Sequence, residues 1–470
     1  MPRFSTVLIS GRSRGAPSCC QERPLPQKPQ LCVAYAESFR CISSACEDTC
    51  CQGWAVPIDQ AAYEMYQKLP ANPLRTLIDA SILRVLEGAK PACFAKIRMN
   101  SANRCPLLTP NLLCRIQAEL GEEFLSHSCA TYPRIIHSIG GIQEIALTLS
   151  CPEAARLVLL TPDLHAREPL ESAAQFDDSV NAAPATMGSP LLFSWFWPIR
   201  RVVLALIGNR AYPLWQRLFL LGVFCRRLDS ISRGELARSV PGFLGDFQAA
   251  VTSGALLTAM EALPLDCAAQ LEVVLRLAGM LLHRSNVRPR FVECMQAFTA
   301  GIGNGPGVTL ESIAGRYAQA HDRFFEPFFA RHPHILENYL ANAILRCRFP
   351  FGREGVQADE PLSMAREYAL LTAQFALLKG FLIGVAGFHR ESFSAEHVVY
   401  TVQATSKHFE HHPEFLDLAY QLLKESRMDG ARGLAILLRN AEPKPLKPTP
   451  PEIHAPGPQV QYAHTPSAAT

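Results

Sequence analysis

Apolar residues recur every three or four positions along most of the chain from Leu191 to about Asn440. That spacing places them on one face of a helix, so each run predicts a helix with one buried side. No run of alternating apolar and polar residues, the signal of a half-buried strand, interrupts this half. We therefore expect an all-α domain here. The clearest runs are Leu214–Leu228, Ala268–His283, Ala365–Leu382 and Phe415–Lys424.

The preceding part of the chain mixes helix and strand signals. Asp59 is expected to cap a helix that continues through Tyr66. Apolar residues at helical spacing predict a second helix across Pro73–Leu86 and a third across Ile116–Leu125. The short apolar stretch Leu31–Tyr35 is expected to form a strand.

A hairpin is predicted between residues 135 and 149. The apolar runs Ile135–Ile139 and Ile142–Leu149 flank Gly140-Gly141, and glycine accepts the positive φ that a tight turn demands. The second run leads into Ser150-Cys151-Pro152-Glu153, which is typical of a helix start with proline in the first turn. Cys151 would then lie at a helix N-terminus, where the backbone dipole favours the thiolate.

The fold class expected is therefore α+β, in two domains. A cysteine-rich mixed α/β domain is predicted over residues 31–164, followed by the larger all-α domain over residues 191–440. Residues 165–190 are rich in Ala, Pro, Ser and Asp without periodicity, so they are expected to link the two domains. Residues 1–30 lack periodicity and are predicted to form a flexible tail, and residues 441–470 a disordered Pro-rich tail.

Composition and charge exclude several classes of protein. An apolar fraction of 48% and a charged fraction of 19% are typical of a globular protein, not a disordered or fibrous one. A net charge of +3 gives no argument for nucleic acid or an anionic membrane as a partner. The most apolar segment, Leu191–Ile207, contains Pro198, Arg200 and Arg201, so it predicts a buried helix rather than a membrane span. The N-terminus lacks the apolar core of a secretory signal, and we expect a cytoplasmic protein with reduced thiols.

The cysteines carry the strongest chemical signal. Ten of the 16 lie between Cys32 and Cys151. Thiols packed so closely in a chain with no sign of secretion indicate a metal site rather than disulfides. Cys19 and Cys20 lie in the expected tail, where nothing would hold them in place. The four cysteines of the helical half lie in apolar patterns and are expected to be ordinary core residues: Cys225, Cys267, Cys294 and Cys347.

The spacing of the clustered cysteines bears on the metal. Zinc ribbons and fingers normally show paired C-x2-C knuckles, and the chain contains none. The C-x3-C-x2-C spacing of radical S-adenosylmethionine enzymes is also absent. Cys46 and Cys50 have the first part of that spacing, but the next cysteine, Cys51, follows Cys50 directly. Sites made only of thiolates otherwise suit iron–sulfur clusters. The spacings therefore favour iron–sulfur over zinc without excluding zinc.

The stretch FRCISSACEDTCCQGW, residues 39–54, closely resembles the opening motif of the flagellin lysine-N-methylase family. That family is related to a wider class of cysteine-rich domains thought to chelate iron or zinc. The resemblance spans roughly Tyr35 to Phe351, with specific cysteine motifs and weaker helical ones. It continues through CPLL at 105–108, LC at 113–114, CATYPR at 129–134, LSCPE at 149–153, ENYLAN at 337–342 and FPF at 349–351.

The resemblance implies a protein-lysine N-methyltransferase that uses S-adenosylmethionine to methylate lysines of flagellin, with a 4Fe-4S cluster. By motif position the implied metal ligands are Cys41, Cys46, Cys50, Cys51, Cys105, Cys114 and Cys129, with Cys151 as a weaker candidate. One four-iron cluster needs only four thiolates, so the others would lie around it or hold a second metal. Tyr132 and Arg134 flank Cys129 without being ligands, and they are the candidate catalytic residues.

The binding site for S-adenosylmethionine is harder to place. A conventional methyltransferase shows a strand, a Gly-rich turn and a later acidic residue. The Gly-rich run Ala300–Gly307 follows a helical pattern instead, across Phe291–Phe298, and is expected to be an interhelical loop. A site in this protein would then not be of the Rossmann type. The cluster itself, or polar groups around Tyr132 and Arg134, would anchor the sulfonium ligand.

Three further polar groups have a structural interpretation beside a functional one. His408, His411 and His412 resemble a metal cluster, but they are expected to be solvated at a helix end. Glu47-Asp48 would provide bases near the cluster, or would form only an acidic turn. The polar residues of Asn338–Asn342 share a helical face, where they would line a cleft or bridge two helices.

A second hypothesis comes from a different class of protein. In it the metal, iron–sulfur or zinc, is structural or carries electrons, and the helical half is a docking surface for a partner protein. The lack of a visible cofactor cradle supports this alternative. A ligand bound only by the folded state must stabilise it, so a rise in melting temperature with S-adenosylmethionine would distinguish the two hypotheses.

Overall fold

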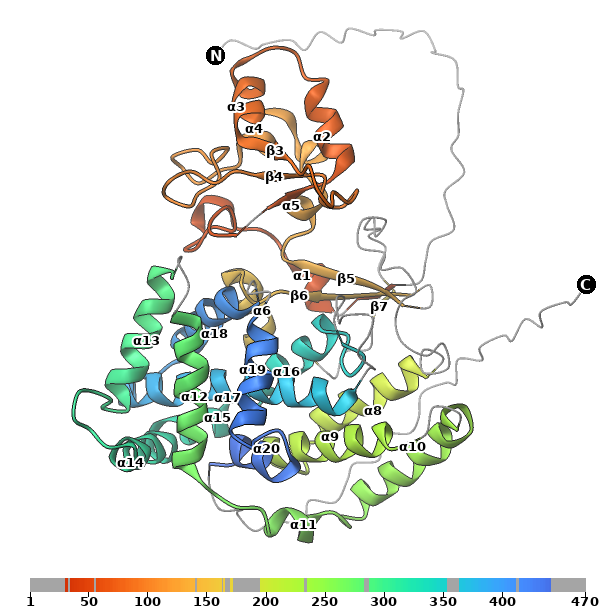
Figure 1. Cartoon of the computed structure of the whole chain (residues 1–470), viewed down its shortest axis with the longest axis vertical. Helices are drawn as coiled ribbons and strands as arrows, with labels where there is room; N and C mark the ends of the chain where they lie inside the picture. Colours follow the sequence, from red (N-terminus) through yellow and green to blue (C-terminus); the bar gives the residue numbers. More distant parts are fainter. Residues whose placement is uncertain are drawn as a thin grey trace, which may run out of the picture.

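The structure is a computed structural model, and it is mostly helical with two small sheets (Figure 1). A small lobe that carries one sheet lies above a larger helical body, and the second sheet lies at their junction. The described residues are 30–32, 34–54, 56–139, 142–162, 164, 170–171, 195–231, 235–282, 287–352, 363–410 and 414–440.

The small lobe is built on a three-stranded antiparallel sheet of order β2-β4-β3. Its core is a separate cluster that includes Ile58, Tyr66, Ile78 and Leu107. Asp59 caps α2 as predicted, since its Oδ1 accepts a hydrogen bond of 2.9 Å from the Ala62 amide. The elements of the lobe are η1 Ser43–Ala45, β2 Pro57–Ile58, α2 Gln60–Gln67, α3 Pro73–Ser81, β3 Ile82–Arg84, β4 Ala95–Ile97, α4 Arg115–Leu120, η2 Glu122–Phe124 and α5 His127–Thr131.

Two predicted helices of this lobe are shorter than expected. The helix predicted across Pro73–Leu86 ends at Ser81, because Ile82–Arg84 pairs with β4 as a strand. Tertiary pairing therefore overrides the helical spacing of the apolar residues there. The helix predicted across Ile116–Leu125 ends at Leu120, where Gly121 takes a φ of +103° that breaks the helix.

The second sheet has four strands in the order β5-β6-β1-β7, and only β1 and β6 are parallel. The predicted hairpin is confirmed, because Ile139 pairs with Ile142 and so leaves a two-residue connection. Gly140-Gly141 themselves lie outside the described residues. The strand predicted across Leu31–Tyr35 is only partly right, since a helix begins at Ala34. The elements are β1 Gln30–Cys32, α1 Ala34–Ser38, β5 Arg134–Ile139, β6 Ile142–Leu147, α6 Pro152–Leu160 and β7 Leu170–Glu171.

The described residues from 195 to 440 form helices and no strand, as the spacing of apolar residues predicted. The Gly-rich run Ala300–Gly307 connects α13 to α14, as expected of an interhelical loop. The helices are α8 Phe196–Gly208, α9 Leu214–Asp229, α10 Leu236–Thr252, α11 Leu257–Glu261, α12 Cys267–Leu282, α13 Pro289–Gly301, α14 Leu310–Ala320, η3 His321–Phe325, α15 Glu326–Arg331, α16 His334–Arg346, α17 Met364–His389, η4 Arg390–Ser392, α18 Ala395–Phe409, α19 Phe415–Glu425 and α20 Ala431–Leu438.

The central helix of the body is α17, which the other helices surround. It is the one helix among the described residues that is long and apolar enough to cross a membrane, yet the whole of its apolar window is buried inside the fold. Its burial on all sides accounts for its apolar composition. The segment Leu191–Ile207 is described from residue 195 and forms α8. Arg200 of α8 is buried and pairs with Glu144 of β6 at 2.9 Å.

The four-stranded sheet and the helical body share one hydrophobic core. Tyr35, Ile145 and Val158 are buried in the same cluster as Leu340 and Val398. The small lobe thus has its own hydrophobic core, distinct from the one that the four-stranded sheet shares with the helical body. The domain limits at residues 164 and 191 stay a prediction, because nearly all of the expected linker, 165–190, lies outside the described residues, as do the expected tails apart from residue 30.

The ENYLAN motif of α16 explains how the sheet is attached to the body. Asn338 donates hydrogen bonds to the carbonyls of Val158 and Thr161, at the end of α6. Asn342 donates to the Leu147 carbonyl of β6 and accepts a 2.8 Å bond from the Tyr35 hydroxyl. These residues therefore bridge elements by hydrogen bonds, which is the structural interpretation of their pattern.

Candidate functional site

A cavity of about 490 Å³ opens where the small lobe meets the four-stranded sheet. This volume is in the range of small-molecule and cofactor sites and far exceeds the space that one metal ion needs. Eight cysteines from separate parts of the chain line it: Cys41, Cys46, Cys50, Cys51, Cys105, Cys114, Cys129 and Cys151. All seven ligands implied by the resemblance, together with Cys151, therefore surround one space. Cys93, in the same lobe, does not line it.

Backbone hydrogen bonds hold the segment around Cys51 against the segment around Cys105. The Cys105 amide donates to the Cys51 carbonyl at 2.9 Å, and the Gly53 amide donates to the Asn103 carbonyl at 2.9 Å. Gly53 has a φ of +80°, and the guanidinium of Arg288 occupies the place that a Cβ would take. Only glycine fits both conditions, which gives a physical reason for the glycine that follows the cysteine pair.

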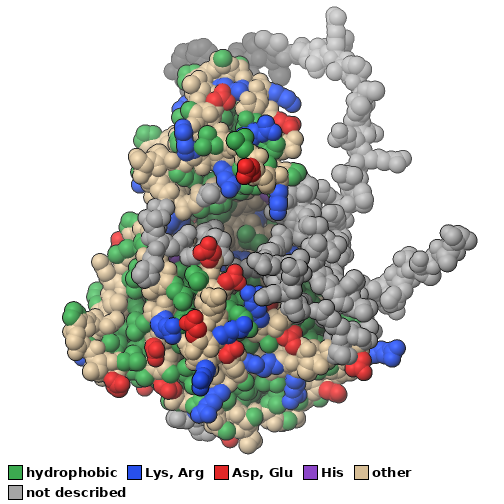
Figure 2. All heavy atoms as spheres, in the orientation of Figure 1, with side chains coloured by type: hydrophobic (Ala, Val, Ile, Leu, Met, Phe, Trp, Pro, Cys, Tyr) green, Lys and Arg blue, Asp and Glu red, His purple; other side chains and the backbone are tan. Residues whose placement is uncertain are grey.

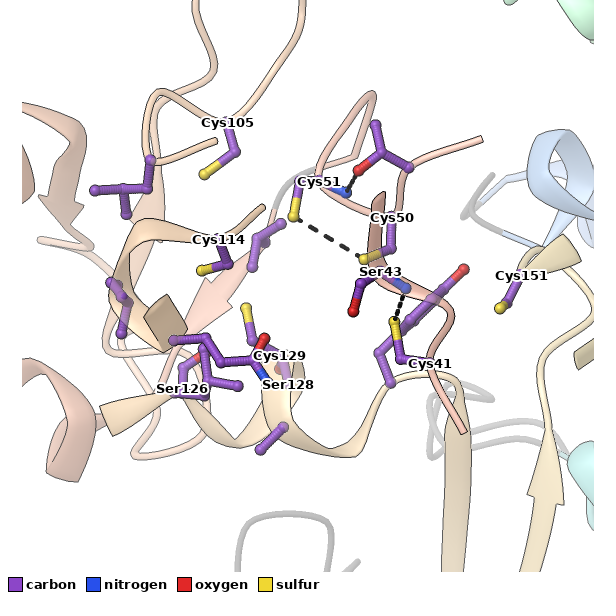
Figure 3. A pocket seen from close by; sticks show the side chains of 18 of the residues that line it. Cys41, Ser43, Cys50, Cys51, Cys105, Cys114, Ser126, Ser128, Cys129 and Cys151 are labelled. Carbon is purple, nitrogen blue, oxygen red and sulfur yellow. Dashed lines mark hydrogen bonds between the residues drawn. The ribbon is translucent and has the colours of Figure 1, made fainter. Parts of the chain in front are cut away.

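Local turns place the other cysteines of the lobe. Leu108 and Cys114 form an isolated antiparallel bridge, which folds the chain back after Cys105. Cys129 lies in the short helix α5, whose first amide, of His127, donates to Asp59 Oδ2 at 2.8 Å. Asp59 therefore caps α2 and holds α5 at once. In Figure 3 four sulfurs turn toward one common space: those of Cys51, Cys105, Cys114 and Cys129.

These thiols influence one another electrostatically. Burial, together with the charges of Cys129 and Cys114, raises the pKa of Cys105 to about 12. Burial likewise raises the pKa of Cys129 to about 12, against a hydrogen bond from Ser126 that lowers it. The pKa of Cys50 is raised by its hydrogen bond with Cys51, whose sulfur lies 4.0 Å away, and by burial. Without a cation nearby the cavity therefore disfavours thiolates.

A second group of thiols lies on the side toward the body. It comprises Cys41, Cys46 and Cys151. The charge of Cys50 contributes to raising the pKa of Cys46 and of Cys151, and the charge of Cys41 contributes to raising that of Cys46. Cys151 does precede α6 with Pro152 at its first position, as predicted. The backbone amides of Glu153 and Ala154 lower its pKa, as expected at a helix N-terminus, but burial outweighs them and raises the pKa to about 12.

The donor set suits a metal group held by thiolates, because soft sulfur ligands predominate in the lining. A bound cation would also offset the burial and mutual repulsion that raise the thiol pKa values. Across the described residues, however, no three His, Cys, Asp or Glu side chains converge on a point where one ion could bind. Thiols distributed around a large space fit a cluster that extends over several ångströms better than a single ion.

A buried ion pair fixes the cysteine loop to the helical body. Lys407 of α18 pairs with Asp48 at 2.7 Å and donates to the Thr49 carbonyl at 2.9 Å. Gln403, one turn earlier, donates to Asp48 Oδ2 at 2.7 Å and to the Ser150 carbonyl at 3.0 Å. Asp48 is therefore engaged in holding the loop, and neighbouring Glu47 pairs with Arg156 at 2.8 Å. Neither carboxylate is placed as an isolated base.

Tyr132 and Arg134, the two candidate catalytic residues, both line the cavity. The ring of Tyr132 stacks against that of Trp54, with centroids 6.2 Å apart. Burial raises the pKa of Tyr132 well above its usual value, and the charge of Cys151 adds to this effect. The guanidinium of Arg134 lies over the Phe39 ring, 5.2 Å from its centroid, and donates to the Phe39 carbonyl at 3.1 Å. Aromatic faces and the Arg134 guanidinium thus lie beside the thiols, and Arg40 also lines the cavity.

The structure corrects the interpretation of the C-terminal histidines. His408 is buried rather than solvated, and its Nε2 accepts a hydrogen bond of 3.2 Å from the Arg288 amide. It packs against the Phe291 ring, because α18 lies along α13. His411 and His412 lie outside the described residues. Three of the four cysteines of the helical half are buried, and Cys267 is half-buried, in agreement with a core role.

Several residues of the site were not found from the sequence. Lys407, Gln403 and Arg288 hold the cysteine loop from helices more than 230 positions away along the chain. Their only signal is a polar residue in an apolar helical pattern, which is common on any solvated helix face. Trp54 was visible beside the cysteine pair, but no pattern assigned it a role.

Comparison with known proteins places the chain among methylases. A sequence model of the FliB lysine N-methylase C-terminal domain matches residues 200–437. A protein named lysine-N-methylase from Salmonella typhimurium is 25% identical over 392 residues, which cover 80% of this chain and 91% of that protein. One of the same name from Salmonella choleraesuis is 24% identical over 389 residues, with the same coverage. The flagellar biosynthetic protein FliU of Salmonella muenchen is 34% identical over 131 residues, which cover 28% of this chain and 76% of FliU. No solved structure matches.

Proposed function

Since this chain belongs to the FliB lysine N-methylase family, we propose that it transfers methyl groups from S-adenosylmethionine to lysine side chains of flagellin. The relatives named lysine-N-methylase match 80% of this chain over 91% of their own length, so the proposal rests on most of the chain. The flagellar name of a third relative supports a flagellar protein as the substrate.

One observation supports the position of the active site. Eight cysteines, four aromatic side chains and Arg134 line a single cavity at the junction of the lobe and the body. Much of the rest of the chain serves to hold these segments together, through the Lys407–Asp48 ion pair and the Cys51–Cys105 backbone pairing. We therefore assign methyl transfer to this cavity.

We propose that the thiols hold a four-iron cluster. Cys105, Cys114, Cys129 and the adjacent Cys50–Cys51 pair are the first candidates for its four ligands, because they line one side of the cavity together. Cys41, Cys46 and Cys151 would lie around it. Bound there, the cluster would supply iron as an anchor for the methyl donor and would tie the lobe's segments together.

The remaining lining residues suit the methyl donor. A sulfonium is a cation, and the faces of Trp54 and Tyr132 would attract it as aromatic rings attract other organic cations. Arg134 would pair with the carboxylate of the donor's methionine part, since a guanidinium matches that group in charge and shape. The donor would then lie with its methyl group exposed to the space that an incoming lysine must enter.

The chemistry asks three things of the protein. The lysine amine must be neutral, it must approach in line with the bond that breaks, and water must be kept out. The apolar lining of the cavity, which includes Val56, Ile58 and Leu107, would desolvate an entering ammonium and favour its neutral form. The new nitrogen–carbon bond forms as the carbon–sulfur bond breaks, and the donor leaves as a neutral thioether.

The proposal is tested by transfer of labelled methyl groups from S-adenosylmethionine to flagellin from the same organism, with anaerobically purified protein. We expect label on flagellin lysines, and we expect S-adenosylmethionine to raise the melting temperature. Arg134→Met should lower turnover and abolish that thermal shift while leaving the metal content unchanged. Arg98→Met, on the lobe surface away from the cavity, is the matched control and should change neither.

Absence of transfer from a protein with an intact metal centre, together with no thermal shift, would overturn the proposal. That result would favour the alternative of a docking module in which the metal is structural. Full activity in Arg134→Met would remove this residue from the site while leaving the activity itself in place.

A further inference from the structure

A chain of hydroxyl groups leads from the cavity into the helical body. The Tyr132 hydroxyl lies 3.1 Å from Ser150 Oγ, which lies 2.9 Å from Thr148 Oγ1. The Thr148 hydroxyl in turn is hydrogen-bonded to Oε2 of Glu410, in the residue that follows α18. The other oxygen of Glu410 faces Arg346 Nε of α16 at 3.4 Å. The chain thus joins a candidate catalytic residue to a carboxylate whose side chain is 4% exposed.

The carboxylate fixes the direction of every hydrogen bond in this chain. An ionised carboxylate only accepts, so the Thr148 hydroxyl must donate to Glu410. A hydroxyl has one proton, so Thr148 then accepts from Ser150, and Ser150 accepts from Tyr132. The Tyr132 oxygen is left with its lone pairs available to a group in the cavity. Tyr132 is therefore oriented as an acceptor there and not as a donor.

We propose that Tyr132, Ser150, Thr148 and Glu410 form a proton relay that takes the proton from the substrate lysine before methyl transfer. The inference rests on the proposed function, which requires a neutral amine. Tyr132 is the group that touches the substrate, whereas Glu410, Thr148 and Ser150 act through it and are positioning residues. No residue assigned to the metal takes part.

The transfer balances in protons and charge. The ammonium of the lysine gives a proton to the Tyr132 oxygen as Tyr132 passes its own proton to Ser150. Ser150 passes its proton to Thr148, and Thr148 passes its proton to the Glu410 carboxylate. The result is a neutral amine in the cavity, a protonated Glu410 and three unchanged hydroxyls. The methylated lysine carries a positive charge once the nitrogen–carbon bond has formed. After the product has left, Glu410 returns its proton through the same three hydroxyls to water in the emptied cavity.

The surroundings of the chain suit this role. The guanidinium of Arg346 lies 3.4 Å from Oε1 of Glu410 and holds the carboxylate in place at the end of the hydroxyl chain. The charged and titratable groups that bear on the Tyr132 end are Cys50, Cys151 and Glu410 itself. The alternative is a purely structural brace, in which these bonds only hold the end of α18 against the turn after β6. The two interpretations differ in what a change of pH does.

Paired substitutions separate the relay from the brace. Glu410→Gln and Thr148→Val should each lower kcat at neutral pH by about 100-fold, with little change in KM for flagellin. Thr148→Ser keeps the hydroxyl and should retain most of the activity, and Glu410→Asp should retain more than Glu410→Gln. The control is Thr405→Val. The buried Thr405 hydroxyl donates to the Thr401 carbonyl of its own helix and lies outside the hydroxyl chain. This substitution should leave kcat unchanged.

The pH profile supplies the second readout. A free lysine loses its proton near pH 10.4 without help, so the defect of Glu410→Gln should shrink as pH rises toward that value. A brace would give a defect that is the same at every pH. A constant defect, or a loss of kcat that merely follows a loss of folded protein, would overturn the relay.

A measurement without turnover keeps this test independent of the proposed function. Infrared spectra of protein with isotope-labelled glutamate carboxyls, compared between wild type and Glu410→Gln, report whether Glu410 is ionised in the resting protein. The relay requires the ionised form, and a protonated Glu410 would overturn it. If the wild type methylates nothing while Glu410 is ionised, the proposed activity fails and the polarity of the hydroxyl chain still stands.

Discussion

His137 of β5 shows how a single buried side chain ties the sheet to the body. Its Nε2 donates a 2.9 Å hydrogen bond to the Arg346 carbonyl at the end of α16. Burial, together with the charges of Arg348, Arg200 and Arg346, lowers the pKa of His137 to about 4. The protein therefore keeps a neutral histidine under conditions in which an unfolded chain would protonate it.

This difference predicts how stability depends on pH. Between about pH 6.5 and pH 4 the unfolded chain binds a proton at His137 that the folded protein does not, so stability falls as the pH falls through that window. The loss from this residue reaches about 3 kcal/mol. Urea unfolding at a series of pH values should show a shallower loss for His137→Gln than for wild type. Equal slopes for the two proteins would contradict this role of His137.

At the residue scale, the sequence predicted the cysteines of the cavity better than the residues that hold them in place. The four cysteines between Cys41 and Cys51 could be singled out, because several thiols at short spacing have few other uses, and all four line the cavity. The polar residues that hold them could not be found, since Lys407 or Gln403 looks like any polar side chain on a helix until its partner is known. The pKa of Cys151 was misjudged because burial leaves no local sequence signal.

At the scale of elements, α18 acts as the support of the cysteine loop. Lys407 reaches Asp48 and Thr49, and Gln403 reaches Asp48 and the Ser150 carbonyl. The ammonium is 3% exposed and the carboxylate 13%, so solvent screens this pair only weakly. A loop that has little regular structure is thereby fixed against a rigid helix.

Removing Lys407 should loosen this loop. Lys407→Met leaves Asp48 buried without its cation, which costs about 3–5 kcal/mol. Hydrogen exchange should then be faster at the amides of residues 49–54, with the body unchanged. Lys424→Met removes only a cation over the Tyr420 ring and serves as the control. Unchanged exchange in Lys407→Met would mean that the backbone pairing with Cys105 alone holds the loop.

Helix interiors were predicted well and helix ends less well. The runs Leu214–Leu228 and Phe415–Lys424 each match a helix within one residue at either end, because a packed apolar face has a clear period. The helix from Pro73 was predicted too long, since Ile82–Arg84 satisfies its backbone in a sheet instead. Pairing with another strand overrides the helical spacing of the apolar residues, and the local sequence does not indicate which strand will be the partner.

At the scale of the whole molecule, the fold is a helical body that carries a small lobe, with the cysteine cavity at their junction (Figure 1). On the face shown in Figure 2, basic and acidic side chains are interspersed over the body, in keeping with a net charge of +3. The mixed fold class was predictable from the change of periodicity along the chain. The shared core of sheet and body was not, because it joins residues such as Tyr35 and Asn342 that lie 307 positions apart.

The central claim is that the cysteine cavity holds an iron–sulfur cluster on which methylation depends. Iron and acid-labile sulfide per chain test it most directly, measured in protein purified without oxygen. The wild type should contain about four of each. Cys129→Ser should lose both, whereas Cys93→Ser, a cysteine of the same lobe outside the cavity, should retain both. Stoichiometric zinc with no iron in the wild type, or full iron in Cys129→Ser, would contradict the account.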